Sequence, residues 1–424
     1  MNLIECKQIG EKAYKEKLEN GLEVIIIPKE NFNKKYIIFG TKFGSIDNTF
    51  INPETNKRTA VPDGVAHFLE HKMFEQKNGE DALYAMMALG IDANAYTTND
   101  HTAYLFECTD HFYEGLDLLM DYVQNPYFTN ENVEKEKGII GQEIRMYEDD
   151  PGWQLYMQTM DCLYKNNPIK IDIAGSIESI SKINPDILNE CYSTFYNPSN
   201  MVLVACGNFE PEELLEEIKK RLLKARAQGN IERIYPELET EINKKYSEKK
   251  MPISMPIFML GFKDKVLADK NEMIKKHLAL EILMNYIVGE SSDLYSELYD
   301  NGLVLGNLDF DYEFSSQYAH ATISGQSEKP ENVAKKIESK IEEIKEKGID
   351  KTEFDRIKKK VYGEYILQFN DVSSVGRLFL ANSVKGVESF DYISNFKNID
   401  LEFTKRVLMD VFSENNRVLS VIQK

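Results

Sequence analysis

The sequence predicts an α+β protein made of two similar repeats, each a mainly antiparallel sheet packed with helices. Short apolar runs separated by turn signals alternate with amphipathic helices in residues 1–228, as in sheets covered by helices. The same order of strands and helices returns in residues 251–424. The chain of 424 residues is also too long for a single hydrophobic core, so at least two domains are expected.

The first repeat has clear local signals for strands and helices. Asn20 and Gly21 form a strong hairpin turn signal, and an apolar run over residues 24–27 follows this turn. Residues 93–98 and 102–109 are rich in aromatic and β-branched side chains, which indicates a pair of strands. Further strands are expected over 36–45 and 201–209, and helices over 65–74, 82–90, 111–147 with a break near Pro126, and 211–227.

A polar, highly charged stretch at residues 229–250 is typical of a linker and separates the two repeats. When the repeats are aligned so that Phe354 lies opposite Val133, Glu364 also lies opposite Glu143. The identity is low, so the similarity depends mainly on the order of elements. In the second repeat, strands are expected over 255–262, within 308–325 as a pair, and over 417–423, with helices over 277–289, 292–302, 331–348 and 352–369.

The composition argues against several classes of protein. A net charge of −19 disfavours nucleic-acid binding, because a phosphate backbone requires a basic surface. No run of about 18 apolar residues occurs, so no membrane span is expected. The five cysteines form no CxxC pair, which indicates reduced thiols and excludes a cysteine-rich zinc site. The N-terminal residues lack the apolar core of a secretory signal, and we therefore expect a cytoplasmic protein.

Residues 67–71, which read HFLEH, carry the strongest functional signal in the chain. On a helix, His67 and His71 lie one turn apart on the same face, so both imidazoles can reach one metal ion. Glu70 is placed to take a proton from a metal-bound water, as in the inverted zinc-peptidase signature. The alternative is a helix with one core histidine and one surface histidine. The aligned second-repeat segment, residues 288–292, has no histidine, so only the first repeat can bind metal in this way.

A catalytic zinc usually has three protein ligands and leaves a fourth position for water. His101 and His111 are near the motif in sequence, but the strongest candidates lie within residues 133–150. There Glu136 and Glu143 are two helical turns apart, which places both carboxylates on one face of a helix. A solvated charged helix would show the same spacing and is the alternative.

Two glycines between these carboxylates are unusual for a helix. Gly138 and Gly141 each cost about 1 kcal/mol relative to alanine in a helix interior. Small residues at these positions would allow another helix to approach closely. We therefore expect this segment to be a ligand helix that packs against a partner.

Three stretches resemble the pitrilysin/insulinase family of inverted-motif (HxxEH) zinc peptidases. They read GVAHFLEHKMF, NAYTTNDHTAY and NVEKEKGIIGQEIRMYEDDP, and they follow the family's order and spacing through most of the first repeat. The stretch GESSDLYSELYDNGLV resembles the family's second-repeat helix more loosely. The chain length is similar to that of the small bacterial branch related to mitochondrial processing peptidase. The resemblance implies a pitrilysin/processing-peptidase-like fold.

The resemblance also implies a metal site. It assigns one zinc ion per chain to His67, His71 and Glu143. Glu148 has a spacing nearer that of longer family members, but it falls outside the matching helix pattern, so Glu143 is preferred. Glu136 matches a second acidic residue of the family, which supports the site without necessarily binding metal.

The implied activity is that of a zinc metalloendopeptidase with Glu70 as the catalytic base. It would hydrolyse peptides or unfolded segments in a closed two-subunit chamber. The family's substrate-pairing edge strand matches Ala93, Asn94, Ala95, Tyr96 and Thr97, which would bind an extended peptide by strand addition. The alternative is a non-catalytic or peptide-binding subunit of a similar heterodimeric complex.

The sequence departs from the family at the groups that stabilise the oxyanion. Related peptidases carry an arginine and a tyrosine in the second repeat, within an ELR…Y pattern. Here Glu297 and Leu298 are followed by Tyr299, and Leu305 lies near the expected tyrosine. Either Tyr312 or another tyrosine nearby substitutes, or a partner chain supplies the pair. We expect a homo- or heterodimer with a family member of similar size, and the missing pair favours the heterodimer.

Overall fold

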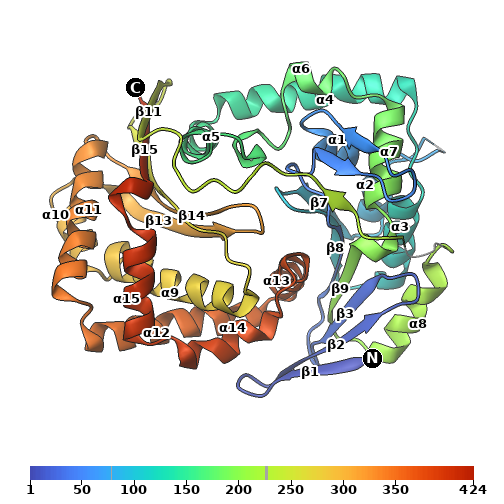
Figure 1. Cartoon of the computed structure of the whole chain (residues 1–424). Helices are drawn as coiled ribbons and strands as arrows, with labels where there is room; N and C mark the ends of the chain where they lie inside the picture. The colour runs from blue at the N-terminus through green and yellow to red at the C-terminus, as the bar shows by residue number, and fades with distance from the viewer. Residues whose placement is uncertain (78, 225–227) are drawn as a thin grey trace. The chain divides into compact units, whose positions relative to one another are not determined.

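The computed structural model describes residues 1–77, 79–224 and 228–424, and the chain forms two compact units (Figure 1). The first unit comprises Met1–Ile144, Ile171–Tyr235 and Leu367–Phe390. The second unit comprises Arg145–Lys170, Pro236–Ile366 and Asp391–Lys424. Each unit therefore contains a segment from the opposite half of the sequence.

The first unit is built on a seven-stranded sheet in the order β1-β2-β3-β9-β4-β8-β7. All neighbouring strands are antiparallel except β3 and β9, which are parallel. The predicted turn joins β2 to β3, with Gly21 at a φ of 89° and the Leu22 N–H donating to the Asn20 side chain. The strands are β1 (Asn2–Cys6), β2 (Glu11–Lys17), β3 (Glu23–Pro28), β4 (Lys35–Thr41), β7 (Asp92–Thr97), β8 (Thr102–Cys108) and β9 (Met201–Gly207).

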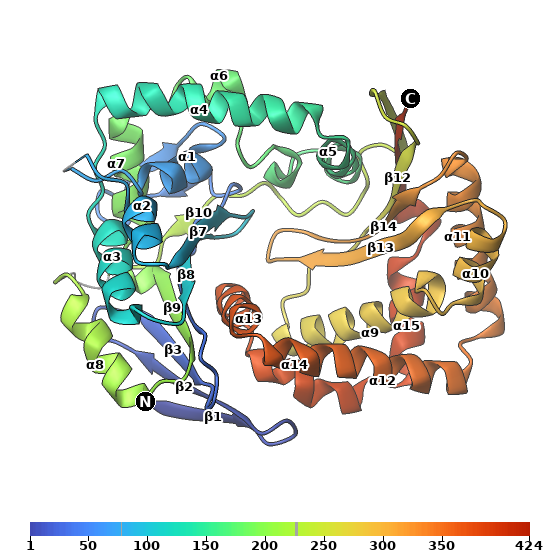
Figure 2. The same cartoon turned by 180° about the vertical axis from the view of Figure 1, so that it is seen from behind.

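The main core of this unit lies between the sheet and helices α1, α3, α7 and α8 (Figure 2). A small sheet, in the order β10-β5-β6, lies beside it, and the predicted break near Pro126 separates α3 from α4. The predicted helix over 211–227 ends at Arg221, and residues 225–227 lie outside the described residues. The other elements are α1 (Val65–Lys72), α2 (Ala82–Ala88), α3 (Phe112–Gln124), α4 (Asn130–Asp149), α6 (Ile177–Ile180), α7 (Pro185–Phe195), α8 (Pro211–Arg221), α13 (Val372–Lys385), β5 (Thr49–Ile51), β6 (Arg58–Ala60) and β10 (Glu232–Arg233).

Helix α13 covers β4 and β9 although it comes from the second half of the sequence. A Cβ atom added at Gly376 would lie 2.4 Å from the Tyr36 ring, and one added at Gly40 would lie 2.6 Å from Leu380. The helix and the strands therefore approach more closely than larger side chains would allow.

The second unit is built on a five-stranded sheet in the order β11-β15-β12-β14-β13. Helix α5 packs against β15 and β12. The strands are β11 (Tyr246–Lys250), β12 (Ile257–Lys263), β13 (Leu305–Phe314), β14 (Ala319–Gln326) and β15 (Arg417–Gln423). The helices are α5 (Pro151–Leu163), α9 (Lys270–Val288), α10 (Asp293–Asp300), α11 (Pro330–Lys347), α12 (Lys351–Leu367), α14 (Ser389–Asn395) and α15 (Leu401–Val411).

Five strands of the first sheet have the same order and directions as the whole second sheet, which confirms the prediction of two similar repeats. From β3 to β7 in the first sheet, and from β11 to β13 in the second, a parallel pair is followed by antiparallel strands, whereas β1 and β2 extend the first sheet alone. Each sheet is also covered by one helix from the opposite half of the sequence, α13 or α5. The charged segment 229–250 contributes two strands, β10 and β11. Both strands lie at sheet edges, where one row of main-chain N–H and C=O groups is not paired with another strand.

The start of α1, the helix that carries the HFLEH motif, depends on a glycine. Gly64 has a φ of 88°, and a Cβ atom there would lie 2.4 Å from the Ala174 carbonyl oxygen. Only glycine tolerates both the left-handed backbone and this close approach. The residues of α1 that follow are buried on almost every side, including Phe68 and Leu69 at 0% exposure.

The two glycines of α4 have different environments. A Cβ atom at Gly141 would lie 3.3 Å from Ile177 of α6, which agrees with close packing. At Gly138 nothing lies within 4 Å, so the expectation that it admits a neighbouring helix is wrong. The positions of the glycines along residues 133–150 do not show which side of the helix faces a neighbouring helix.

Replacement of Gly138 by alanine is expected to stabilise the chain. The site is exposed and helical with free space, so alanine removes backbone entropy from the unfolded chain without a clash. The expected gain is about 0.5–1 kcal/mol, measured as a shift of the urea unfolding midpoint. Gly141→Ala is the comparison, and a larger gain there than at Gly138 would contradict this view.

No helix of the described part of the chain has the length and apolar character needed to cross a membrane.

Candidate active site

The HFLEH motif, the acidic residues of α4 and the predicted edge strand meet in the first unit. His67 Nε2 lies 3.6 Å from Glu143 Oε1, and His71 Nε2 lies 3.5 Å from Glu143 Oε2. These separations exceed the roughly 2.7–3.2 Å of N–H···O hydrogen bonds. Donor atoms about 2.0–2.2 Å from a tetrahedral zinc lie roughly 3.3–3.6 Å apart, so the three side chains fit a zinc ion. No other group of three such side chains with this spacing occurs among residues 1–77, 79–224 and 228–424.

The two imidazoles are held differently. His71 Nδ1 lies 3.1 Å from Glu136 Oε1, whereas buried His67 Nδ1 has no hydrogen-bond partner among the described residues. Burial and the neighbouring His71 lower the pKa of His67 to about 3, which keeps this ring in the neutral form that binds metal. Burial also acts to lower the pKa of His71, but the Glu136 carboxylate and other nearby acids outweigh it and raise that pKa.

Glu136 is itself held by a buried cation. Lys72 Nζ lies 3.4 Å from Glu136 Oε2 and 2.6 Å from Glu75 Oε2, and the Lys72 side chain is 1% exposed. Burial acts to raise the pKa of Glu136, but His71 and Lys72 outweigh it and lower that pKa. Hydrogen bonds of this kind fix the orientation and tautomer of a ligand histidine. The contact of Lys72 with Glu136 could not be predicted from the sequence, because a lysine at the end of a helical motif usually reaches solvent.

Glu70 lies in a largely buried position beside the histidines. It is 7% exposed, and the Thr97 hydroxyl donates a hydrogen bond to its Oε2 at 2.6 Å. Burial raises the pKa of Glu70 to about 7, although Thr97 and His71 act in the opposite direction. A carboxyl group in this environment can both take up and release a proton near neutral pH.

Strand β7 lies at the edge of its sheet, as predicted for residues 93–97. The Thr98 N–H donates to the His101 carbonyl at 2.8 Å, which fixes the alternation of the ladder. The N–H and C=O groups of Ala93, Ala95 and Thr97 therefore point away from β8. The Ala95 N–H donates to the Asn94 side chain at 2.8 Å, in agreement with this direction.

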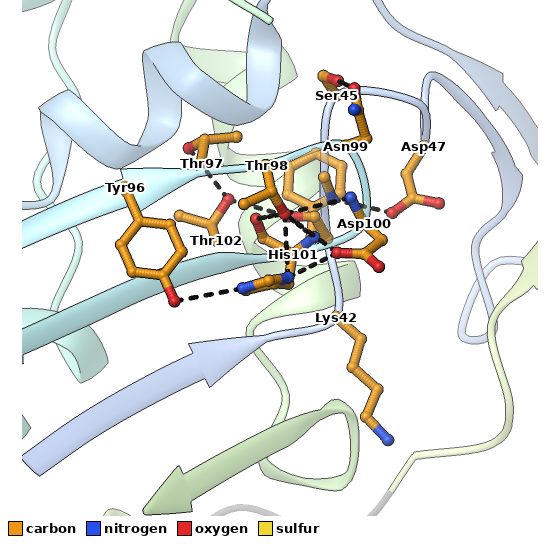
Figure 3. A network of polar contacts seen from close by, with 12 residues as sticks. Lys42, Ser45, Asp47, Tyr96, Thr97, Thr98, Asn99, Asp100, His101 and Thr102 are labelled. Carbon is orange, nitrogen blue, oxygen red and sulfur yellow. Dashed lines mark hydrogen bonds and ion pairs between the residues drawn. The ribbon is translucent and has the colours of Figure 1, made fainter. Parts of the chain in front are cut away.

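The turn between β7 and β8 holds a network of polar side chains (Figure 3). His101 Nδ1 lies 2.6 Å from Asp100 Oδ1 and 2.9 Å from the Thr98 hydroxyl, and its Nε2 lies 3.4 Å from the Tyr96 hydroxyl. His101 is 5% exposed and is therefore not a surface histidine. It is also not a member of the metal group. Its bonds hold the turn that follows Thr97.

The other candidates for the third ligand lie elsewhere. His111 is exposed and pairs with Glu114 at 3.1 Å. Glu148 is exposed near the end of α4 and is not a member of the metal group. Among the candidates named from the sequence, only Glu143 joins the two motif histidines.

A cavity of about 910 Å³ opens beside Glu70 and His71. Its walls come from α1, α2, β7 and α4, together with the segment between α1 and α2. Both apolar and acidic side chains line it: Phe74, Leu83, Tyr84, Ile139, Glu75, Glu80, Asp81 and Glu136. The candidate site thus has room for a peptide side chain next to the edge of β7.

The tyrosine that could replace the family's oxyanion donor is already engaged. The Tyr312 hydroxyl, in the second unit, donates to Asp264 Oδ2 at 2.7 Å, and Tyr312 is 6% exposed. Tyr299 and Leu305 are exposed, at 57% and 59%. Tyr312 would have to break a buried hydrogen bond to donate to a substrate, which disfavours it.

Comparison with known proteins identifies relatives over the whole chain. The family model described as Insulinase (Peptidase family M16) matches residues 58–176, and that described as Peptidase M16 inactive domain matches residues 182–361. The protein named "Uncharacterized zinc protease YmfH" of Bacillus subtilis (strain 168) is 37% identical over 425 residues, covering 99% of both chains.

Solved structures have the same fold. The crystal structure of an M16-like peptidase from Alicyclobacillus acidocaldarius has a TM-score of 0.94 and 33% identity, with 99% of each chain covered. The periplasmic protease PqqL from Escherichia coli has a TM-score of 0.76 and 17% identity, and the match covers 97% of this chain but 47% of that one. With relatives this similar along its full length, the chain belongs to the insulinase family, peptidase family M16.

Proposed function

We propose that this protein is a zinc metalloendopeptidase that hydrolyses peptides or unfolded segments. The observation that carries the proposal is the spacing of His67, His71 and Glu143, whose donor atoms suit one tetrahedral zinc ion, with Glu70 beside them. The names of two Bacillus subtilis relatives, which both contain the words zinc protease, support it. In this proposal each chain binds one zinc ion, through the first repeat.

The chain's own residues have distinct roles in the proposed reaction. Zinc bound at this site supplies Lewis-acid chemistry, which polarises a carbonyl group and acidifies water. Glu70 accepts the proton of the attacking water and later donates it to the amine that leaves when the C–N bond breaks. Glu136 keeps the His71 ring oriented, with Nδ1 hydrogen bonded and Nε2 directed at Glu143.

Strand β7 is the proposed binding edge for the substrate. An extended peptide would pair with the outward main-chain groups of Ala93, Ala95 and Thr97, so that Asn94 and Tyr96 would remain bonded to β8. Because such pairing uses main-chain atoms, it accepts many sequences. The adjoining cavity would receive one substrate side chain.

We also propose that the active form is a dimer that encloses a chamber, with a partner that supplies the missing arginine and tyrosine. The buried hydrogen bond of Tyr312 supports this, because that tyrosine is not free to act as a donor. The length of PqqL, about twice that of this chain, supports a pairing of two similar chains. Residues 1–228 would then form the catalytic repeat, 229–250 a linker and 251–424 a metal-free repeat.

A cytoplasmic location is proposed from the cysteines. All five are free and buried, as expected in a reducing compartment. Fractionation of cells would test this, and recovery of the protein outside the cytoplasm would contradict it.

Metal removal tests the proposed activity. The purified chain, alone and with a candidate partner, is expected to contain about one zinc ion and to cleave a quenched peptide library. A chelator should abolish cleavage, and added zinc should restore it, because the group that would hold the metal among the described residues is two histidines and one carboxylate. Cleavage that survives complete loss of zinc would contradict the proposal. Full activity of the chain alone would reject the heterodimer but not the peptidase.

One alternative is a non-catalytic or peptide-binding subunit of a similar complex. The engaged Tyr312 hydroxyl and the match to the inactive-domain model favour it. This alternative expects zinc and peptide binding without any hydrolysis that depends on Glu70.

A further inference from the structure

Two threonine hydroxyls lie behind Glu70 in a short chain of hydrogen bonds. Thr97 Oγ1 lies 2.6 Å from Glu70 Oε2. It also lies 3.2 Å from Thr102 Oγ1, on the neighbouring strand (Figure 3). The Thr102 hydroxyl lies 2.9 Å from the Phe43 carbonyl oxygen. Thr102 is 0% exposed, so the chain ends inside the protein.

The direction of each bond follows from counting hydrogens. A carbonyl oxygen can only accept, so the Thr102 hydrogen is committed to Phe43, and Thr102 can only accept from Thr97. The Thr97 hydrogen goes to the Glu70 carboxylate rather than to Thr102, because this contact of 2.6 Å is the shorter of the two and a carboxylate is the stronger acceptor. Thr102, which is held by Phe43, lies 3.2 Å from Thr97 Oγ1 and limits where this oxygen can move.

We infer that Thr97 is a positioning residue, whose hydroxyl holds the Glu70 carboxylate in place beside the metal-binding side chains, with Thr102 packed behind it. The inference rests on the proposed function, because it assumes that Glu70 acts on the substrate. Thr97 also belongs to the edge of β7, where its main-chain groups point outward. Thr97 therefore bonds the proposed base with its side chain and forms part of the proposed peptide-binding edge with its main chain.

Substitutions of Thr97 by valine and by serine distinguish the hydrogen bond to Glu70 from the packing of the side chain. Thr97→Val keeps the branched shape but loses the hydroxyl, and its kcat is expected to fall roughly 10–100-fold, as for other supports of an active site. KM and zinc content should change little, because the main chain and the three metal-binding side chains are untouched. Thr97→Ser should restore most of kcat. Thr102→Val should lower kcat less than Thr97→Val, because the bond to carboxylate Glu70 survives.

Thr41→Val is the matched control. Its buried hydroxyl, in the same sheet, donates to the Phe195 carbonyl at 2.6 Å and does not contact Glu70. This variant should lose some stability and keep its kcat. Thr97→Val with wild-type kcat, or Thr97→Ser as impaired as Thr97→Val, would overturn the inference.

A second measurement does not depend on activity. In metal-free chains, Thr97→Val should shift the unfolding midpoint by different amounts in the wild-type and Glu70→Ala backgrounds, because the two side chains interact. Additive shifts would overturn the inference. If the wild-type chain with zinc and partner hydrolyses nothing, the proposed function fails, while this cycle still reports whether Thr97 supports Glu70.

Discussion

Glu70→Gln is expected to remove peptide hydrolysis while zinc stays bound. The amide has nearly the same size as the carboxylate and can still accept the Thr97 hydrogen bond, so the 7% exposed site should keep its packing. An amide cannot take a proton from water, and a positioned general base contributes roughly 10²–10⁴-fold to a rate. We expect kcat to fall by about that factor.

The measurement is kcat for a quenched peptide, together with zinc content of the same preparation. Glu107→Gln on β8 is the control, because this carboxylate pairs with Lys34 at 2.9 Å and has no contact with the site. Activity of Glu70→Gln close to that of the control would reject Glu70 as the base and favour the non-catalytic alternative. Loss of zinc in Glu70→Gln would instead indicate a damaged site.

Glu143→Gln is expected to lose zinc and, with it, activity. Glu143 supplies the only carboxylate within reach of both Nε2 atoms in the described metal group, at 3.6 and 3.5 Å. Without it only the two imidazoles remain of the described metal group, and the loss of affinity should exceed the roughly 10–100-fold typical when an outer hydrogen-bond partner is removed. Competition with a zinc-binding dye would measure the affinity.

Two variants on the same helix give a graded comparison. Glu136→Gln should lower the affinity for zinc by roughly 10–100-fold, because Glu136 acts through the His71 ring. Glu148→Gln should leave the affinity for zinc unchanged, since Glu148 is exposed and lies outside the metal group. Loss of zinc in Glu148→Gln but not in Glu143→Gln would reverse the assignment of the third ligand.

The groups brought together by helix periodicity could be predicted from the sequence. His67 and His71 share a face because their spacing matches one turn, and Glu136 and Glu143 share a face because theirs matches two. Strand β7 could be located from its composition. These properties are local, or periodic along one element, and the structure brings the predicted residues into one site.

Contacts that depend on how separate elements meet could not be predicted. The bond from Thr97 to Glu70 needs the register of β7 against α1, and burial of Lys72 needs two acids from different segments around one ammonium group. The exchange of α5 and α13 is also invisible to local patterns, because both helices have ordinary amphipathic sequences. The order of strands within a sheet is likewise fixed only by packing.

The position of α13 has a consequence for how the protein matures during translation. The face of β4 and β9 against which Gly376 and Leu380 pack has no cover until the ribosome has made residues 372–385. Domains generally fold as units as the chain emerges, but this first unit lacks a layer until most of the 424 residues exist. A truncated chain would thus display an apolar surface and be open to chaperones and degradation. The groups proposed for catalysis therefore belong to a unit completed late in synthesis.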